Sequence, residues 1–157
     1  MGPLRVALAQ IAPGLGALED NLARHHELIA EARAQDADLA VFPELGLTGY
    51  LLQDLNAEVS MRRNDPRLLE LAQAAGDMSV VVSFVEESSD HKLFISAALL
   101  ENQAVRHVHR KVFLPTYGLF DERRFFAAGS TVRAATSEQL DLRLGISICE
   151  DFWHLAT

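Results

Sequence analysis

Cysteine is almost absent from this chain, because its 157 residues include only one, Cys149. A single thiol cannot form an internal disulfide, so the fold does not depend on a disulfide framework. Such low cysteine usage is typical of a reducing compartment. The first residues also lack a basic leader followed by an apolar region, so we expect a cytoplasmic protein without a signal peptide.

Basic residues and long apolar runs are also scarce. The chain has 14 Lys and Arg against 22 Asp and Glu, a net charge of −8, which argues against a surface for nucleic acid or anionic membranes. No apolar run approaches the roughly 20 residues that span a bilayer. The sequence also lacks a Gly-x-x-x-x-Gly-Lys phosphate loop, so we expect no cofactor, ATP and NAD included, in these residues. With 49% hydrophobic residues, residues 1–157 are typical of one globular domain.

The sequence does contain alternating strand and helix signals. Residues 5–11 and 39–42 are short apolar stretches, and residues 18–35 between them have apolar side chains at helical spacing. This order predicts a βαβ unit with parallel strands, so the fold class is α/β. Asp65 and Pro66 are typical of a helix start, and that second helix is expected to end at Gly76.

Three further strands follow, at residues 79–85, 93–100 and 104–109, with the last two joined as a hairpin. Residues 112–129 have few strand or helix signals. A loop of this length inside a compact domain is usually functional or disordered. Its five aromatic residues indicate an ordered loop.

The lone cysteine follows a segment with strand periodicity. The even positions of residues 140–148 are leucine or isoleucine, whereas Gly145 and Ser147 leave space on the opposite face beside the sulfur. We predict a strand over residues 140–148 and a helix start at Glu150 and Asp151. The backbone N–H groups at such a junction are expected to favour the thiolate. The alternative is a buried core cysteine without a chemical role.

Glu44, Lys111 and Cys149 each follow a predicted strand. Functional sites of parallel α/β sheets form at the carboxyl ends of strands, so the three side chains are expected to converge. A carboxylate can take a proton from the thiol, a lysine can stabilise an oxyanion, and a thiolate can attack a carbonyl carbon. Taken singly, Glu44 could be a solvated acid and Lys111 a surface cation.

The motifs around these residues resemble the nitrilase, or carbon–nitrogen hydrolase, superfamily over essentially the whole chain. The matching segments are Phe42-Pro43-Glu44 with Leu47-Thr48-Gly49-Tyr50, Arg110-Lys111-Val112-Phe113-Leu114-Pro115, and Cys149-Glu150-Asp151. The resemblance implies a four-layer αββα sandwich with mixed sheets. Residues 114–126 are further similar to the glutaminase domain of glutamine-dependent NAD synthetases.

The same resemblance implies roles for individual residues. Cys149 corresponds to the nucleophile and Glu44 to the general base and later acid. Lys111, with the backbone N–H of Glu150, corresponds to the oxyanion stabiliser. Glu122 corresponds to a second carboxylate that positions Lys111 and Glu44.

Two residues correspond to the substrate pocket of the NAD synthetase branch, namely Tyr117 and Glu150. From the residues alone, alternatives stay open. Glu122 could simply pair with Arg123 or Arg124, and Tyr117 is as consistent with packing as with ligand contact.

Histidines suggest little further chemistry. His107, His109 and Lys111 alternate onto one strand face, but no cysteine or carboxylate at ligand spacing accompanies them, so we expect no metal site. His25 and His26 lie on the first predicted helix and are expected to be exposed.

The resemblance implies a thiol amidohydrolase that cleaves a non-peptide C–N bond through a thioester and releases ammonia. Glutamine is one candidate substrate, and a small free amide, nitrile or N-carbamoyl compound is another. Family members continue well past the cysteine, whereas this sequence stops at Leu155-Ala156-Thr157. We therefore expect the N-terminal portion of the domain, with an incomplete sandwich, and a C-terminal synthetase domain elsewhere. A homo-oligomer is expected by analogy, and a truncated non-catalytic binding or regulatory module is the competing hypothesis.

Overall fold

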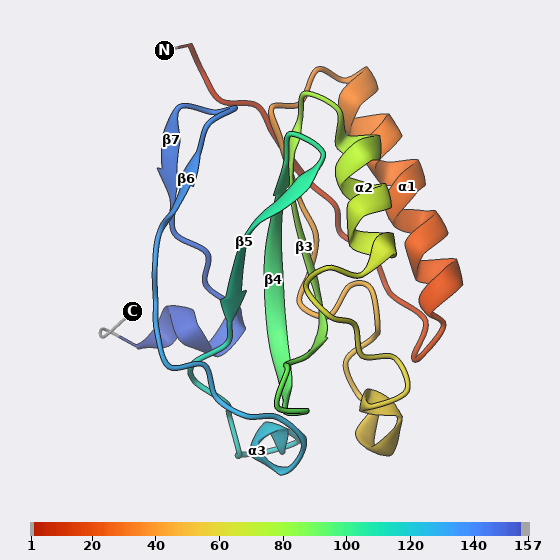
Figure 1. The fold of residues 1–157 in the computed structure, drawn as a ribbon, viewed down its shortest axis with the longest axis vertical. Helices are drawn as coiled ribbons and strands as arrows, with labels where there is room; N and C mark the ends of the chain where they lie inside the picture. The colour runs from red at the N-terminus through yellow and green to blue at the C-terminus, as the bar shows by residue number, and fades with distance from the viewer. Residues whose placement is uncertain (1, 155–157) are drawn as a thin grey trace.

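A computed structural model describes residues 2–154 and shows two helices against a mixed five-stranded sheet (Figure 1). The strands follow in the order β1-β2-β3-β4-β5, with β1, β2 and β3 parallel and β3, β4 and β5 antiparallel. The predicted α/β class and the βαβ unit are confirmed. The strand bounds are β1 Val6–Leu8, β2 Leu39–Val41, β3 Ser79–Glu87, β4 Leu93–Glu101 and β5 Ala104–Arg110.

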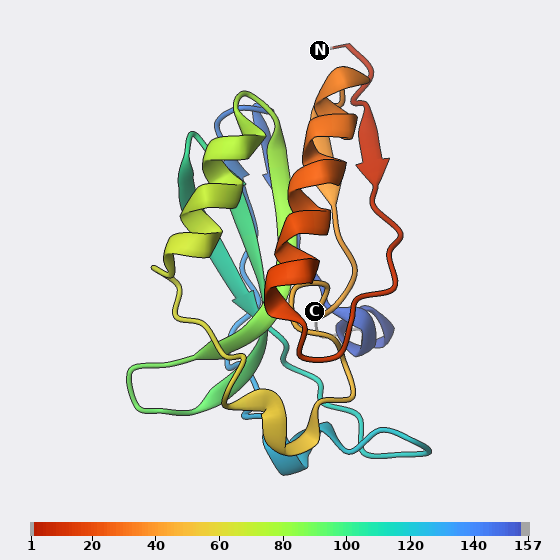
Figure 2. The same ribbon diagram turned by 90° about the vertical axis from the view of Figure 1, so that its right-hand side faces the viewer.

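Helices α1 (Leu18–Ala34) and α2 (Pro66–Ala75) lie together on one face of the sheet (Figure 2). Asp65 caps α2 as predicted, because its carboxylate accepts a hydrogen bond of 3.0 Å from the Arg67 backbone N–H. Gly76 follows the helix with φ +60°, a backbone conformation that glycine adopts without strain. Among residues 2–154 no helix is both long enough and apolar enough to cross a membrane.

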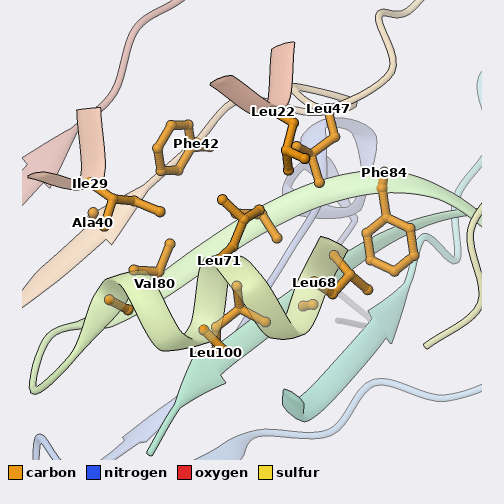
Figure 3. Packing of buried hydrophobic residues seen from close by; sticks show 14 of the residues in the cluster. Leu22, Ile29, Ala40, Phe42, Leu47, Leu68, Leu71, Val80, Phe84 and Leu100 are labelled. Atoms are coloured by element: carbon orange, nitrogen blue, oxygen red, sulfur yellow. The ribbon is translucent and has the colours of Figure 1, made fainter. Parts of the chain in front are cut away.

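The layer between the helices and the sheet is the main apolar core (Figure 3). Ile29 of α1, Leu68 and Leu71 of α2, and Val80 and Phe84 of β3 are all fully buried there. Burial of each such side chain contributes about 1.5–3 kcal/mol to folding. This packing holds β2 and β3 in register, and therefore fixes where the loops after these strands begin.

His25 lies within this layer, so the expectation that it is exposed is wrong. Its ring stacks on Phe42 at 4.1 Å, and its Nδ1 donates to the Asn21 carbonyl at 2.7 Å. Burial lowers the pKa of His25 to about 4, so the ring is neutral near pH 7. The error has a simple cause, because position 25 shares the helical stripe of Leu22 and Ile29.

The opposite face of the sheet carries the later part of the chain. A two-stranded sheet of β6 (Ala135–Ser137) and β7 (Leu142–Leu144) is followed by the 3-10 turn η2 (Cys149–Trp153). The predicted strand over residues 140–148 is therefore too long, since the partner strand β6 offers only three residues for pairing. The side-chain alternation nevertheless holds, with Ile148 buried and Ser147 exposed. The predicted helix start at Glu150 is this short 3-10 turn.

Two short elements were not anticipated from the sequence, namely η1 (Gln53–Asn56) and α3 (Glu122–Phe125), which pack against each other. The second of them lies inside the predicted irregular stretch 112–129, and Phe126 directly after it is buried. The stretch Leu155–Thr157, where the sequence stops, lies outside the described residues.

Candidate functional site

A buried lysine between two carboxylates forms the centre of the candidate site. Lys111 follows β5 directly, and its side chain is fully buried. Its Nζ donates hydrogen bonds to Glu44 Oε1 at 2.6 Å and to Glu122 Oε1 at 2.8 Å. Because a buried charge is stable only when it is paired, these two carboxylates are what permit a lysine at this position.

The backbone around Lys111 and Glu44 is also fixed by hydrogen bonds. The Ser83 hydroxyl of β3 accepts from the Leu45 N–H at 3.0 Å, which anchors the loop that carries Glu44. Gly129 donates its N–H to the Lys111 carbonyl at 2.7 Å. A Cβ at Gly129 would lie 2.3 Å from the Arg110 carbonyl oxygen, so only glycine permits this close approach.

Cys149 lies beside this cluster, at the start of η2. Cys149, Ser147 and Glu44 line a common cavity of about 90 Å³ together with Ser83 and Ala97 of the sheet. The thiol and the Glu44 carboxylate thus face the same small cavity, and each shifts the pKa of the other. Cys149 is exposed, so the alternative of a buried core cysteine is wrong. The small side chain of Ser147 leaves the space beside the sulfur that the sequence predicted.

The pKa values in the cluster shift in complementary directions. Burial raises the pKa of Glu44, and this effect exceeds the lowering by the neighbouring Lys111. Burial alone would lower the pKa of Lys111, but the Glu44 and Glu122 carboxylates raise it above its usual value. The lysine is therefore a permanent cation, whereas Glu44 is a better proton acceptor than an ordinary glutamate.

The pKa of the Cys149 thiol is raised, so the expectation that its position favours a thiolate is wrong. Partial desolvation of the thiol, in a residue that is exposed overall, is the largest cause, and the Glu44 carboxylate raises the pKa further, with Lys111 opposing. A five-residue 3-10 turn also provides little of the dipole that a long helix would. At neutral pH the Cys149 sulfur is therefore a thiol rather than a thiolate.

Glu122 faces Lys111 rather than a neighbouring arginine. Its Oε1 also accepts a hydrogen bond of 2.5 Å from the Tyr50 hydroxyl, and the Glu122 side chain is 4% exposed. Arg124 instead lies 4.0 Å from Asp121. Tyr50 was not singled out from the sequence, although it ends the quoted segment Leu47–Tyr50. Burial, followed by the hydrogen bond to Glu122, raises the pKa of Tyr50, so this residue stays a donor.

Tyr117 and Glu150 lie together on the open side of the site. The Tyr117 hydroxyl donates to Glu150 Oε2 at 2.7 Å, and His154 lies 3.2 Å from Glu150 Oε1. Tyr117 is 58% exposed and contacts Phe120 edge to face, so its ring is available to a ligand. The hydrogen bond from Tyr117 lowers the pKa of Glu150, which therefore remains a carboxylate.

His109 does have a carboxylate partner that sequence spacing did not reveal. Its Nε2 donates to Asp151 Oδ2 at 2.8 Å, across 42 positions of sequence, and both side chains are buried. Across residues 2–154 there is no group of three or more His, Cys, Asp or Glu side chains suited to hold a metal ion. The alternation of His109 with Lys111 on one strand face was the only sequence signal for this contact.

Comparison with known proteins gives matches over almost the whole chain. Glutamine-dependent NAD(+) synthetase of Thermotoga maritima is 38% identical over 155 residues, which cover 98% of this chain and 27% of that protein. The structure of glutamine-dependent NAD+ synthetase from Acinetobacter baumannii with ADP aligns with a TM-score of 0.82 and 34% identity, over 98% of this chain and 29% of that one. The chain thus spans less than a third of the length of these relatives.

An amidase of Nesterenkonia sp. AN1 is similar in structure. One of its variants, which carries the acetamide moiety of fluoroacetamide on the active-site cysteine, aligns with a TM-score of 0.71 and 27% identity. This alignment covers 83% of the present chain and 50% of the amidase chain. The family model for carbon-nitrogen hydrolases matches residues 5–155. The chain therefore belongs to the carbon-nitrogen hydrolase family.

Proposed function

We propose that this chain hydrolyses a carboxamide through a thioester on Cys149, with Glu44, Lys111 and Glu122 completing the catalytic group. The observation that carries the proposal is the Lys111 ammonium bridging two carboxylates, one of which lines the same cavity as the thiol. Burying a lysine costs desolvation energy, and a residue with only a structural role could avoid this cost by staying on the surface. The fixed positive charge of the Lys111 ammonium is suited to stabilise an oxyanion.

In the first half-reaction, Glu44 accepts the thiol proton while the sulfur attacks the amide carbon. The raised pKa of Glu44 makes this transfer easier than with an ordinary glutamate. The carbonyl oxygen becomes an oxyanion, which the Lys111 ammonium and the Glu150 backbone N–H stabilise. Glu44 then returns its proton to the amide nitrogen, the C–N bond breaks, and ammonia leaves.

In the second half-reaction, a water molecule attacks the thioester. Glu44 takes a proton from that water, the tetrahedral intermediate collapses, and the carboxylic acid product leaves as the proton returns to the sulfur. Glu122 keeps Lys111 in position throughout, since it accepts a hydrogen bond from Nζ at 2.8 Å.

We favour glutamine as the amide. The relatives at 38% and 34% identity are named as glutamine-dependent NAD synthetases. The Glu150 carboxylate, oriented by Tyr117, offers a partner for the α-ammonium group of an amino-acid substrate. A small free amide is the second candidate, and the amidase with acetamide on its cysteine favours it.

The ammonia would serve a synthetase segment that accompanies this domain. The chain matches 27% of the Thermotoga maritima protein, which leaves ample length there for a second activity. We also propose a cytoplasmic, homo-oligomeric enzyme. Light scattering of the purified protein tests the oligomer, and a monomer at all concentrations would contradict it.

The test compares ammonia release from glutamine and from acetamide by the protein and by its Cys149→Ala variant. We expect faster release from glutamine and loss of all release in the variant, with a thiol alkylator labelling the unmodified protein once. Faster release from acetamide would favour the small-amide alternative. A folded protein with an unreactive thiol and no turnover would favour the non-catalytic module.

A further inference from the structure

A single buried carboxylate connects the backbone on both sides of the candidate site. Asp151 Oδ1 accepts hydrogen bonds from the backbone N–H groups of Val112 at 3.0 Å and Phe113 at 2.9 Å. Its Oδ2 accepts from the backbone N–H of Ile148 at 3.1 Å and from His109 Nε2 at 2.8 Å. In Figure 1 the turn that carries Asp151 lies beside the end of β5.

These donors flank the two groups that must meet. Val112 and Phe113 directly follow Lys111, and Ile148 directly precedes Cys149. The four hydrogen bonds therefore tie the segment of the lysine to the segment of the cysteine through one side chain, although the two segments are 38 positions apart, as 149 − 111 gives. Within residues 2–154 no strand pairing does this, since β5 pairs with β4 and β7 pairs with β6.

The local backbone at the nucleophile needs such support. Cys149 has φ +44°, in the left-handed region that residues with a Cβ rarely adopt, and such a conformation costs about 1–3 kcal/mol. The hydrogen bond from Ile148 to Asp151 spans this residue and closes the turn around it. The strain is therefore compensated by a group that also reaches across to β5.

Asp151 and His109 are suited to a rigid connection. Asp151 is fully buried and the His109 side chain is 1% exposed, so water cannot readily replace their hydrogen bonds. Burial would raise the pKa of Asp151, but the hydrogen bonds from His109 and the three backbone N–H groups lower it below its usual value. The carboxylate consequently stays charged and accepts from all four donors at once.

We propose that Asp151, supported by His109, is a positioning residue that sets where the Cys149 sulfur lies relative to Lys111 and Glu44. The four hydrogen bonds described above go to His109 and to backbone N–H groups, so Asp151 acts by holding the two backbone segments together. This inference rests on the proposed function for its catalytic consequence. Whether Asp151 places the sulfur beside Glu44 can be tested by thiol alkylation, which does not require turnover of a substrate.

The test is a double-mutant cycle on the alkylation rate of Cys149 in the full chain. Glu44→Gln removes the carboxylate charge that raises the pKa of the Cys149 thiol, so we expect more thiolate at neutral pH and alkylation at least about fivefold faster in the otherwise unmodified protein. In an Asp151→Asn background we expect the same substitution to change the rate less than about twofold, because the sulfur no longer faces residue 44. If the two effects simply multiply, the proposal is overturned.

Glu86→Gln is the matched control. Glu86 is as buried as Asp151 and accepts from Arg110 at 2.7 and 2.9 Å, next to Lys111, but the hydrogen bonds of its carboxylate go to Arg110 and Ser96 rather than to the Cys149 segment. It should lose thermal stability comparably yet leave the effect of Glu44→Gln intact. If Glu86→Gln weakens the effect of Glu44→Gln as much as Asp151→Asn does, then Asp151 contributes only to overall stability and the proposal is overturned.

Two further measurements cover other outcomes. If Asp151→Asn does not fold, His109→Met removes one of the four donors and should weaken the coupling partially, whereas His109→Gln, which retains a donor, should restore it.

Amide turnover by the Asp151→Asn variant should fall about 100-fold in kcat with little change in KM, the size expected for a misplaced reacting group. A change confined to KM would contradict positioning. Absence of turnover in the unmodified protein would refute the proposed function but leave the alkylation cycle valid.

Discussion

The two sides of the five-stranded sheet are stabilised in different ways. Beneath α1 and α2, apolar side chains such as Leu71, Val80 and Phe84 exclude water by close packing. On the other side, Lys111 and Asp151 are just as buried, and each depends on several specific hydrogen bonds. Hydrocarbon packing tolerates small shifts. Loss of one partner, in contrast, leaves a buried charge uncompensated and strongly destabilises the fold.

This difference shows how one layer supports the other. The apolar side holds the strands in place, so the polar side can hold charged groups whose desolvation costs several kcal/mol per ion. A substitution on the helix side should therefore change stability without changing thiol chemistry. A substitution on the polar side should change both.

Lys111→Met should have the largest effect. It removes the only cation that the Glu44 and Glu122 carboxylates share in the described contacts, and loss of one partner from a buried ion pair costs about 3–5 kcal/mol. Amide turnover should fall by about 10²–10³, as for loss of an oxyanion donor. Urea unfolding and ammonia release measure the two effects. Lys92→Met, at an exposed lysine paired with Asp90, is the control and should change neither.

Leu71→Ala should have the next largest effect, and only on stability. Leu71 is fully buried between α2 and the sheet, and such a truncation costs about 2–5 kcal/mol. The alkylation rate of Cys149 should stay within about twofold of that of the unmodified protein. Leu69→Ala on the same helix, at a residue that is 37% exposed, should cost less than about 0.5 kcal/mol. A large change in thiol reactivity in Leu71→Ala would contradict the separation of the two sides.

The smallest of the three effects concerns the one buried histidine of the helix side. The pKa of His25 is about 4 in the folded protein, against 6.5 for a solvated histidine, so the unfolded chain takes up a proton first as pH falls. The stability that this residue contributes is present above pH 6.5 and is lost as pH falls toward 4. Between about pH 7.5 and pH 5 the loss should be about 2 kcal/mol.

Urea unfolding at the two pH values tests this, with His25→Phe as the comparison. Phenylalanine preserves an aromatic ring against Phe42 but has no titrating nitrogen, so its stability should change with pH by about 2 kcal/mol less over this range. Identical pH dependence in the two proteins would rule out His25 as the source.

Much of the helix side was predictable. The apolar periodicity of α1, the Asp65 cap and Gly76 of α2, and the β-branched run of β3 depend on local preferences that a sequence carries directly. The segment after residue 129 was less predictable, because β6 and β7 are short and exist only as partners of each other. The neutral His25 was also missed, since burial was judged from residue type rather than from its place in the helical stripe.

For the candidate site, the sequence identified Glu44, Lys111, Glu122 and Cys149, and the ordered motifs identified the family. The sequence could not indicate whether Glu122 pairs with Lys111 or with a neighbouring arginine. In the structure Glu122 accepts hydrogen bonds from Lys111 and Tyr50. The sequence also led to the wrong protonation state for Cys149, because the desolvation of the thiol and its distance from Glu44 are both set by the folded structure.

The sequence by itself therefore determined the α/β layer and the chemical groups available to it, because hydrophobic periodicity, capping residues and motif spacing are local properties of the chain. Only the tertiary structure decided that Asp151 would join the segments of Lys111 and Cys149, and that the thiol would face a carboxylate. Those outcomes depend on distances between residues far apart in sequence, and hydrogen bonds and electrostatic effects on pKa act over a few ångströms of space.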